Sequence, residues 1–243
     1  MGYGAHLDSD MASELTLAQH LCREGTLVSS SWYYSTEIRL LSTQLVYTPL
    51  MALFPHDWRM VRTLGNLLLA AALAGACCFA ARQAVALSRE RDALLRALFA
   101  GFLSVTLLVN SVSCVKNALA HPQYLTDKRM AAVEAIRERG LSLGYATFWS
   151  ANIVTELSDG EIEVVALEQT GGGMSPLYWM EAEESFAMNA PEEPVFLLLG
   201  VWEEEGMEDF LARCRAEWVE LDGWINLYEI PSQRLLLESL TGI

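Results

Sequence analysis

The sequence predicts an α-helical membrane part, with two transmembrane helices and interfacial helices, followed by a C-terminal α/β domain with a small, mostly parallel sheet. Two uncharged apolar runs, residues 64–81 and 97–115, predict the membrane part. A helix needs about 20 residues to cross the ~30 Å hydrocarbon core of a bilayer. Helix-like and strand-like segments alternate in the later part of the chain, which predicts the α/β domain. We therefore divide the chain into residues 1–62, 63–116 and 117–243.

Composition agrees with this division. The hydrophobic fraction of the 243 residues is 52% and the charged fraction is 19%, so the chain is more apolar than an average soluble domain. The formal net charge is −15, and most of the acidic side chains lie in residues 117–243. Such a surface repels a polyanion, so nucleic acid is not an expected partner. The expected partner of the middle part is the lipid bilayer.

An acidic cluster opens the chain. Residues 11–22 have apolar side chains at helical spacing, with Asp10 as the expected N-cap and Glu14 near the third helical position. The cluster, which also contains Asp8, would then lie at the positive end of a helix. His6, Asp8 and Asp10 alternate, so an extended chain would point all three side chains one way and could hold a divalent metal ion. The sequence indicates no other cofactor.

A second segment of the first region is typical of a helix at a membrane interface. A polar aromatic stretch at residues 29–36 leads into an apolar segment, residues 40–54, that ends before Pro55. Tryptophan and tyrosine prefer the level of the lipid headgroups, and an amphipathic helix next to them can lie in the plane of the membrane. We therefore expect this segment to rest on the bilayer surface.

Basic residues predict the orientation in the membrane. The connection between the two apolar runs contains Arg82, Arg89, Arg91 and Arg96. By the positive-inside rule this connection lies in the cytoplasm, and both termini of a multi-pass protein in the cell membrane are extracytoplasmic. The basic residues that flank the outer ends of the runs, and oppose this orientation, are Arg59, Arg62, Lys116, Lys128 and Arg129.

The last region follows a repeating helix and strand pattern. Its expected helices cover residues 127–139, 150–157, 176–188 and 203–214, and its expected strands cover residues 145–149, 161–167, 194–200 and 224–230. A helix between successive strands is typical of a parallel sheet.

Two local motifs of this region have structural interpretations. Gly171, Gly172 and Gly173 lack the spacing of a dinucleotide fingerprint and predict a loop, with phosphate binding as the alternative. The acidic run that starts at Glu203 and Glu204 predicts the solvated start of a helix, where acidic residues are favoured, with a cation site as the alternative.

Three stretches of the first region are DSDMASELTLAQHL from residue 8, WYYSTEIR from residue 32 and TPL from residue 48. Together they resemble the first extracytoplasmic loop of C-type glycosyltransferases, in particular the family of aminoarabinose and mannosyl transferases that use polyprenyl-phosphate sugars. Residues 144–160, GYATFWSANIVTELSDG, resemble the extracytoplasmic C-terminal domain of bacterial members of the same group.

This resemblance implies transfer of a sugar from a polyprenyl-phosphate carrier to a cell-envelope acceptor. Asp8 or Asp10 would be the catalytic base that takes the proton of the acceptor, and Arg39 would bind the lipid phosphate. The other residues that the resemblance assigns to substrate binding are Glu14, Tyr33 and Tyr34.

Members of that family have many more membrane spans than this sequence predicts. The resemblance therefore also implies a shortened or incomplete member, inactive as an isolated chain, whose missing spans lie on a partner chain. A second hypothesis is a noncatalytic two-span protein that presents an extracytoplasmic α/β interaction domain, in which Asp10 and Glu14 only cap a helix. A third is a soluble α/β protein that buries the apolar hairpin in its own core.

Overall fold

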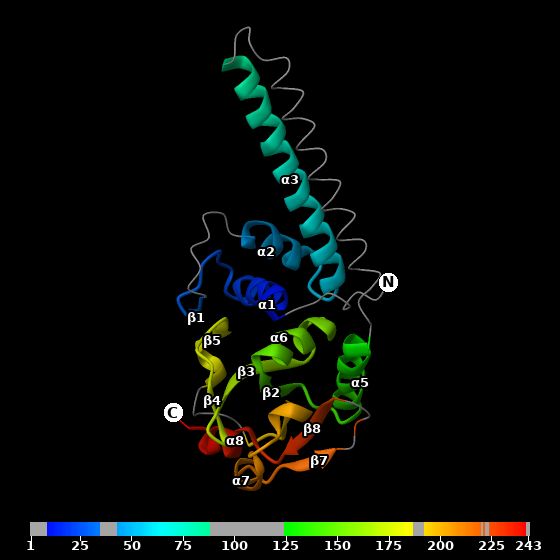
Figure 1. Cartoon of the computed structure of the whole chain (residues 1–243), viewed down its shortest axis with the longest axis vertical. Coiled ribbons are helices and arrows are strands. Elements are labelled where there is room, and N and C mark those ends of the chain that lie inside the picture. Colours follow the sequence, from blue (N-terminus) through cyan, green and yellow to red (C-terminus); the bar gives the residue numbers. More distant parts are fainter. Residues whose placement is uncertain are drawn as a thin grey trace.

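The structure is a computed structural model that describes residues 9–34, 43–87, 124–186, 192–219, 221 and 224–241. In this part of the chain seven α-helices accompany a six-stranded and a two-stranded sheet. Figure 1 shows layers of helices on both sides of the larger sheet and one long helix, α3, that leads away from them. The larger sheet is therefore the centre of the fold.

The larger sheet has the strand order β4-β3-β2-β6-β8-β7. Its strands are β2 (Leu143–Thr147), β3 (Glu163–Thr170), β4 (Gly173–Pro176), β6 (Val195–Gly200), β7 (Glu217–Val219) and β8 (Ile225–Ile230). Strand β2 is parallel to both β3 and β6, whereas β4, β7 and β8 are antiparallel to their neighbours. The sheet is mixed, and the prediction of a mostly parallel sheet is wrong.

Short hairpins explain the mixed sheet. Gly171 and Gly172 have positive φ angles of 51° and 87°, which let the chain reverse and bring β4 back beside β3. The predicted helix at residues 176–188 is also wrong. This segment contains β5 (Glu181–Ala182) and a short 3-10 helix, and Met180 has a φ of 54°, outside the range of a right-handed helix.

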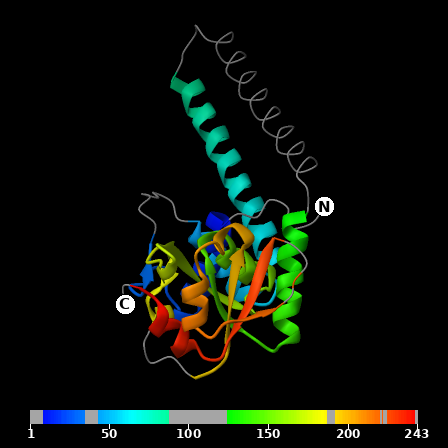
Figure 2. The same cartoon turned by 60° about the horizontal axis from the view of Figure 1, so that its bottom comes forward.

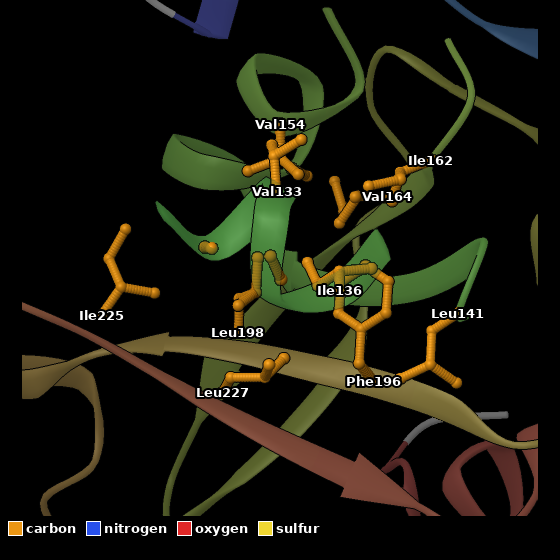
Figure 3. Close-up of a cluster of buried hydrophobic side chains, with 14 of the residues drawn as sticks. Val133, Ile136, Leu141, Val154, Ile162, Val164, Phe196, Leu198, Ile225 and Leu227 are labelled. Atoms are coloured by element: carbon orange, nitrogen blue, oxygen red, sulfur yellow. The ribbon is translucent and has the colours of Figure 1, made fainter. Parts of the chain in front are cut away.

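Helices cover both faces of the larger sheet, and an apolar cluster fills each interface. One cluster involves α5 (Tyr124–Glu138) and α6 (Phe148–Leu157), and the other involves α7 (Glu208–Arg213) and α8 (Gln233–Ser239). Figure 3 shows the first cluster, in which Val133 and Val154 point toward the sheet. Every residue of β6 is buried, as expected for a strand that is covered on both faces.

The first region adds another layer over α6. Helix α1 (Ser9–Glu24) packs on α6, and α2 (Gln44–Leu53) packs on α1. Strand β1 (Trp32–Tyr33) pairs with β5 in the two-stranded sheet. Residues far apart in the sequence thus form one body.

Helix α3 (Trp58–Leu87) is the one helix of the described residues that is long and apolar enough to cross a membrane. Its candidate span is Trp58–Phe79, and only 17% of the apolar window is buried, so α3 is not a core helix of the domain. Both views show it projecting from the other helices (Figure 1, Figure 2). The expected boundary after residue 62 falls inside α3, and the second expected span, residues 97–115, lies outside the described residues.

A buried ion pair fixes the foot of α3, which we define as residues 58–66. The Arg62 Nε donates to the Glu156 Oε1 at 2.9 Å, and the Arg62 Nη2 donates to the Glu156 Oε2 at 2.6 Å. The same Nη2 donates to the Met11 carbonyl of α1 at 2.6 Å. One arginine of α3 therefore binds both α6 and α1. The backbone N–H of Trp58 adds a hydrogen bond to the Asp159 Oδ1 at 2.8 Å.

We predict that each single replacement of this pair, Arg62→Met or Glu156→Leu, lowers the free energy of unfolding by about 3–5 kcal/mol, because it leaves one buried charge unpaired. The double replacement should recover most of this loss. Denaturant unfolding of the full chain in detergent measures the effect.

The matched control is Arg234→Ala, which removes the exposed pair between Arg234 and Glu238. It should leave the free energy of unfolding almost unchanged, because an exposed ion pair is well solvated. Equal losses for the control and for the single replacements of the buried pair would show that the pair does not anchor α3.

Candidate functional site

Asp10 is the one residue of the predicted catalytic pair that the structure describes, and it lies at the start of α1. Asp10 is exposed in the first turn of this helix, which begins at Ser9, so Asp10 is inside the helix rather than at its N-cap. The Ser9 Oγ donates to the Phe148 carbonyl at 2.6 Å and fixes this end of α1 on α6. Asp8 and Arg39 lie outside the described residues, so their predicted roles stay predictions.

Glu14 lies one helical turn after Asp10 and is half-buried. Its Oε1 accepts a hydrogen bond from the Thr43 Oγ1 at 3.1 Å, and its carbonyl accepts one from the Gln44 Nε2 at 2.9 Å. Glu14 therefore connects α1 to the start of α2. These contacts give it a structural role, and its role in substrate binding stays a prediction.

The two predicted tyrosines lie near β5. The Tyr33 carbonyl accepts a hydrogen bond from the Met180 N–H at 2.6 Å, and its ring centroid lies 5.1 Å from that of Tyr178. The Tyr34 hydroxyl accepts a hydrogen bond from the Ser29 N–H at 2.9 Å. The structure thus holds Tyr33 and Tyr34 beside β5, while Asp10 and Glu14 share α1.

Asp10 is next in sequence to a contact between α1 and the foot of α3. The next residue, Met11, gives its carbonyl to Arg62 in the second turn of α3. An exposed carboxylate is thus one residue away from a direct contact with the candidate membrane helix. That these carboxylates lie near a bilayer stays a prediction.

A second candidate site lies at the carboxyl edge of the parallel strands. A hollow of about 390 Å³ opens where β2 and β3 end, and we call it the edge hollow. From β2 the chain continues through α6 to β3, which lies on one side of β2 in the sheet. Strand β6 lies on the other side of β2. Such a reversal of strand order is where open α/β sheets bind ligands. The residues that line the edge hollow are Thr147, Phe148, Trp149, Leu167, Glu168, Gln169, Leu177, Trp179 and Glu203.

The prediction that Glu203 is solvated is wrong. Glu203 is only 7% exposed, and its Oε1 accepts a hydrogen bond from the Thr147 Oγ1 at 2.7 Å. Its Oε2 accepts one from the Gly200 N–H at 2.6 Å. The carboxylate therefore joins the ends of β2 and β6. The signal that could have revealed it is the Gly-x-x-Glu spacing at the end of a predicted strand, because a glutamate three residues after an N-cap can accept a hydrogen bond from the N-cap N–H.

Glu204, the next residue of the acidic run, also has specific partners. Its carboxylate accepts hydrogen bonds from the Asn226 Nδ2, at 2.6 Å, and from the Tyr228 hydroxyl. Burial and the neighbouring Glu204 carboxylate raise the pKa of Tyr228. The predicted helix at residues 203–214 is shorter in the structure, where α7 covers Glu208–Arg213.

Glu181 is a buried carboxyl group that the sequence prediction missed, because it assigned this segment to a helix. Its Oε2 accepts a hydrogen bond from the Ala166 N–H of β3, at 3.0 Å, and its Oε1 accepts from the Ala182 N–H, at 3.0 Å, and from the Ser185 Oγ, at 3.2 Å. Burial raises the pKa of Glu181 to about 7.

Asn152 is a buried amide without a hydrogen-bond partner in the part of the chain that the structure describes. It lies one turn after Phe148 and one turn before Glu156 on α6, and both of these residues contact α1 or α3. Residues one turn apart share a helix face, so Asn152 lies on the face that meets α1. An unpaired buried amide costs about 1–3 kcal/mol.

The metal prediction is not tested by the structure. Among the described residues no group of three or more histidine, cysteine, aspartate or glutamate side chains could hold a metal ion, and two of the predicted ligands, His6 and Asp8, lie outside them. Asp10 alone cannot define a metal centre.

Comparison with protein-family models, with curated proteins and with solved structures found no match to this chain. The fold and the two candidate sites define the class: a layered α/β domain with a mixed sheet, fixed to the foot of one apolar helix.

The buried Glu181 predicts a pH effect on stability. Its pKa of about 7 in the folded chain exceeds the ordinary value of 4.5, so the unfolded chain loses this proton first as the pH rises. The contribution of Glu181 to stability is complete below about pH 4.5 and is lost as the pH approaches 7. Relative to Glu181→Gln, the wild type should therefore lose stability over this range. Unfolding of both proteins as a function of pH measures it, with the exposed Glu168→Gln as control. Parallel curves for wild type and Glu181→Gln would contradict the assignment.

The unpaired amide predicts a stabilising replacement. Asn152→Leu should raise the free energy of unfolding by about 1 kcal/mol, because it removes a buried polar group that has no partner. The control is Thr155→Val on the same helix, which removes a hydroxyl that accepts from the Val164 N–H at 3.0 Å and should destabilise the protein. A similar loss for both variants in denaturant unfolding would show that the amide is paired.

Proposed function

We propose that the chain is a membrane-anchored protein of the glycosyltransferase type, which acts on a sugar carried by a polyprenyl phosphate at the extracytoplasmic face of the cell membrane. The observation that carries the proposal is the exposed Asp10 carboxylate, which is next in sequence to the Met11 carbonyl that Arg62 of α3 binds. A lipid-borne sugar phosphate lies at the surface of the bilayer, so a base at the foot of a membrane helix can meet it.

The chemistry needs a base and a cation. An acceptor hydroxyl attacks the anomeric carbon of the donor, the bond between this carbon and the phosphate oxygen breaks, and the acceptor proton passes to a carboxylate. We assign the base to Asp10 or its neighbour Asp8. The departing phosphate keeps the electron pair and needs positive charge, which we assign to Arg39. Glu14, Tyr33 and Tyr34 would bind the substrates.

The exposed apolar surface of α3 supports a partner in the membrane. Its large side chains Leu67 and Leu73 are 62% and 66% exposed, and lipid or neighbouring helices would cover them. We propose that further membrane spans on a partner chain complete the transferase, and that the isolated chain does not transfer sugar.

Exposed tryptophans favour a second candidate function, a noncatalytic anchored domain that binds a ligand or a partner. Trp149, Trp202 and Trp224 are 66%, 63% and 52% exposed, which is unusual for so large an apolar side chain. In this function Asp10 has no chemical role, so its replacement separates the two candidates.

We predict that Asp10→Asn lowers sugar transfer by a factor of about 100 or more if Asp10 is the general base. The assay follows labelled sugar from polyprenyl phosphate into the cell envelope, in source-organism membranes that lack the native protein and carry the full-length variant. Asp209→Asn, which changes an exposed aspartate of α7, is the matched control.

Full transfer in the Asp10→Asn membranes would contradict the base assignment, and full transfer without the chain would favour the noncatalytic function.

A separate measurement tests whether α3 anchors the chain in the membrane. Release of the chain by an alkaline wash would contradict the assignment of α3 to the membrane.

A further inference from the structure

We infer that the edge hollow binds a neutral sugar ring. This inference uses the geometry of the α/β domain alone and does not require the transferase chemistry proposed for α1. A sugar ring needs a flat apolar surface for its C–H face and hydrogen-bonding groups for its hydroxyls, and the edge hollow has both.

The aromatic wall is built before any ligand arrives. The rings of Phe148 and Trp179 stack with centroids 4.9 Å apart and an interplanar angle of 28°. Trp149 meets Phe148 edge-on at 5.6 Å and stays 66% exposed. Aromatic neighbours therefore hold the indole of Trp149 while leaving it accessible, so a ligand that stacks there loses little side-chain entropy on binding.

The polar groups of the edge hollow are fixed as well. Hydrogen bonds from Thr147 and from the Gly200 N–H hold the two oxygens of Glu203, and each oxygen has a further lone pair that can accept from a hydroxyl. Gln169 donates to the Glu203 carbonyl at 3.0 Å, which places its amide at the rim. Glu168 is exposed beside it.

The charge of the lining selects against anionic ligands. The described residues that line the edge hollow include Glu168 and Glu203 and no lysine, arginine or histidine. The N-terminus of a helix carries a partial positive charge that attracts anions. At the N-terminus of α6 the Glu203 carboxylate already occupies this position, because it accepts a hydrogen bond from the N-cap residue Thr147. A phosphate group would meet repulsion here, so a nucleotide is disfavoured and a neutral polyhydroxyl ligand is favoured.

A second aromatic surface lies next to Glu203. A Cβ atom at Gly200 would be 2.9 Å from the Trp202 ring and 3.2 Å from the Glu203 Oε2, so both side chains pack against the same glycine. The Trp202 and Trp224 rings lie 6.3 Å apart, and both are more than half exposed. The site therefore extends along the edge of the sheet and fits an oligosaccharide better than a single ring. The volume of the hollow, about 390 Å³, is in the usual range for small-molecule sites.

The test titrates the full chain in a detergent without a sugar headgroup. The probes are the methyl glycosides of glucose, galactose, mannose and N-acetylglucosamine, their disaccharides, and glucose 6-phosphate as the anionic comparison. Saturation-transfer NMR and tryptophan fluorescence report binding. We expect saturable binding of at least one neutral saccharide, stronger binding of its disaccharide, and weaker binding of glucose 6-phosphate.

Two tryptophan variants make the assignment specific. Trp149→Ala should raise Kd about tenfold or more, a loss of about 1.4 kcal/mol or more. Trp218→Ala, which removes a tryptophan of β7 that is 58% exposed, should leave Kd unchanged. Failure of every saccharide to bind, or equal Kd values for wild type and Trp149→Ala, would overturn the inference. The titration measures binding and not sugar transfer, so a failure of the transferase proposal and a failure of this inference are distinguishable.

Discussion

The arrangement of the described chain depends on one buried ion pair. Arg62 belongs to α3, Glu156 belongs to α6, and the Met11 carbonyl that also binds Arg62 belongs to α1. A buried charge that loses its partner costs several kcal/mol, so these three elements cannot separate independently. Glu156 is fully buried and Arg62 is 5% exposed, which makes this constraint strong. The contact of Met11, the residue next to Asp10, with α3 is part of it.

The position of α6 between the sheet and α1 explains its composition. One face of α6 packs on the sheet through Ala151 and Val154, and another packs on α1 through Ile153. A helix between two layers has little contact with water, so it needs few polar side chains. Its buried polar residues contact other elements, as Glu156 does, or have no hydrogen-bond partner among the described residues, as is true of Asn152. A fragment that began at residue 121 would therefore expose the face of α6 that α1 covers.

Local patterns predicted the elements that depend on local physics. The apolar run in β6 and the helical spacing in α1 are both visible in the sequence, and the structure has a strand and a helix there. The short strands β4 and β5 could not be predicted in this way, because each exists through pairing with β3 or β1. The orientation of β8 likewise depends on its partners, because it is antiparallel to both β6 and β7.

The two candidate sites also differ in how far local sequence patterns could predict them. Asp10 and Glu14 were predictable as acids in the first turns of a helix, because this is a local preference. For Glu203 the Gly-x-x-Glu spacing indicates only the local bond to the Gly200 N–H, whereas its contact with Thr147 of β2 depends on the packing of two distant segments. The two sites are also linked: the Ser9 hydroxyl binds the Phe148 carbonyl at 2.6 Å, and Phe148 lines the edge hollow. If the hollow holds the acceptor sugar, this hydrogen bond keeps it near the helix turn that contains Asp10, and a base and its acceptor would then belong to one rigid contact between α1 and α6.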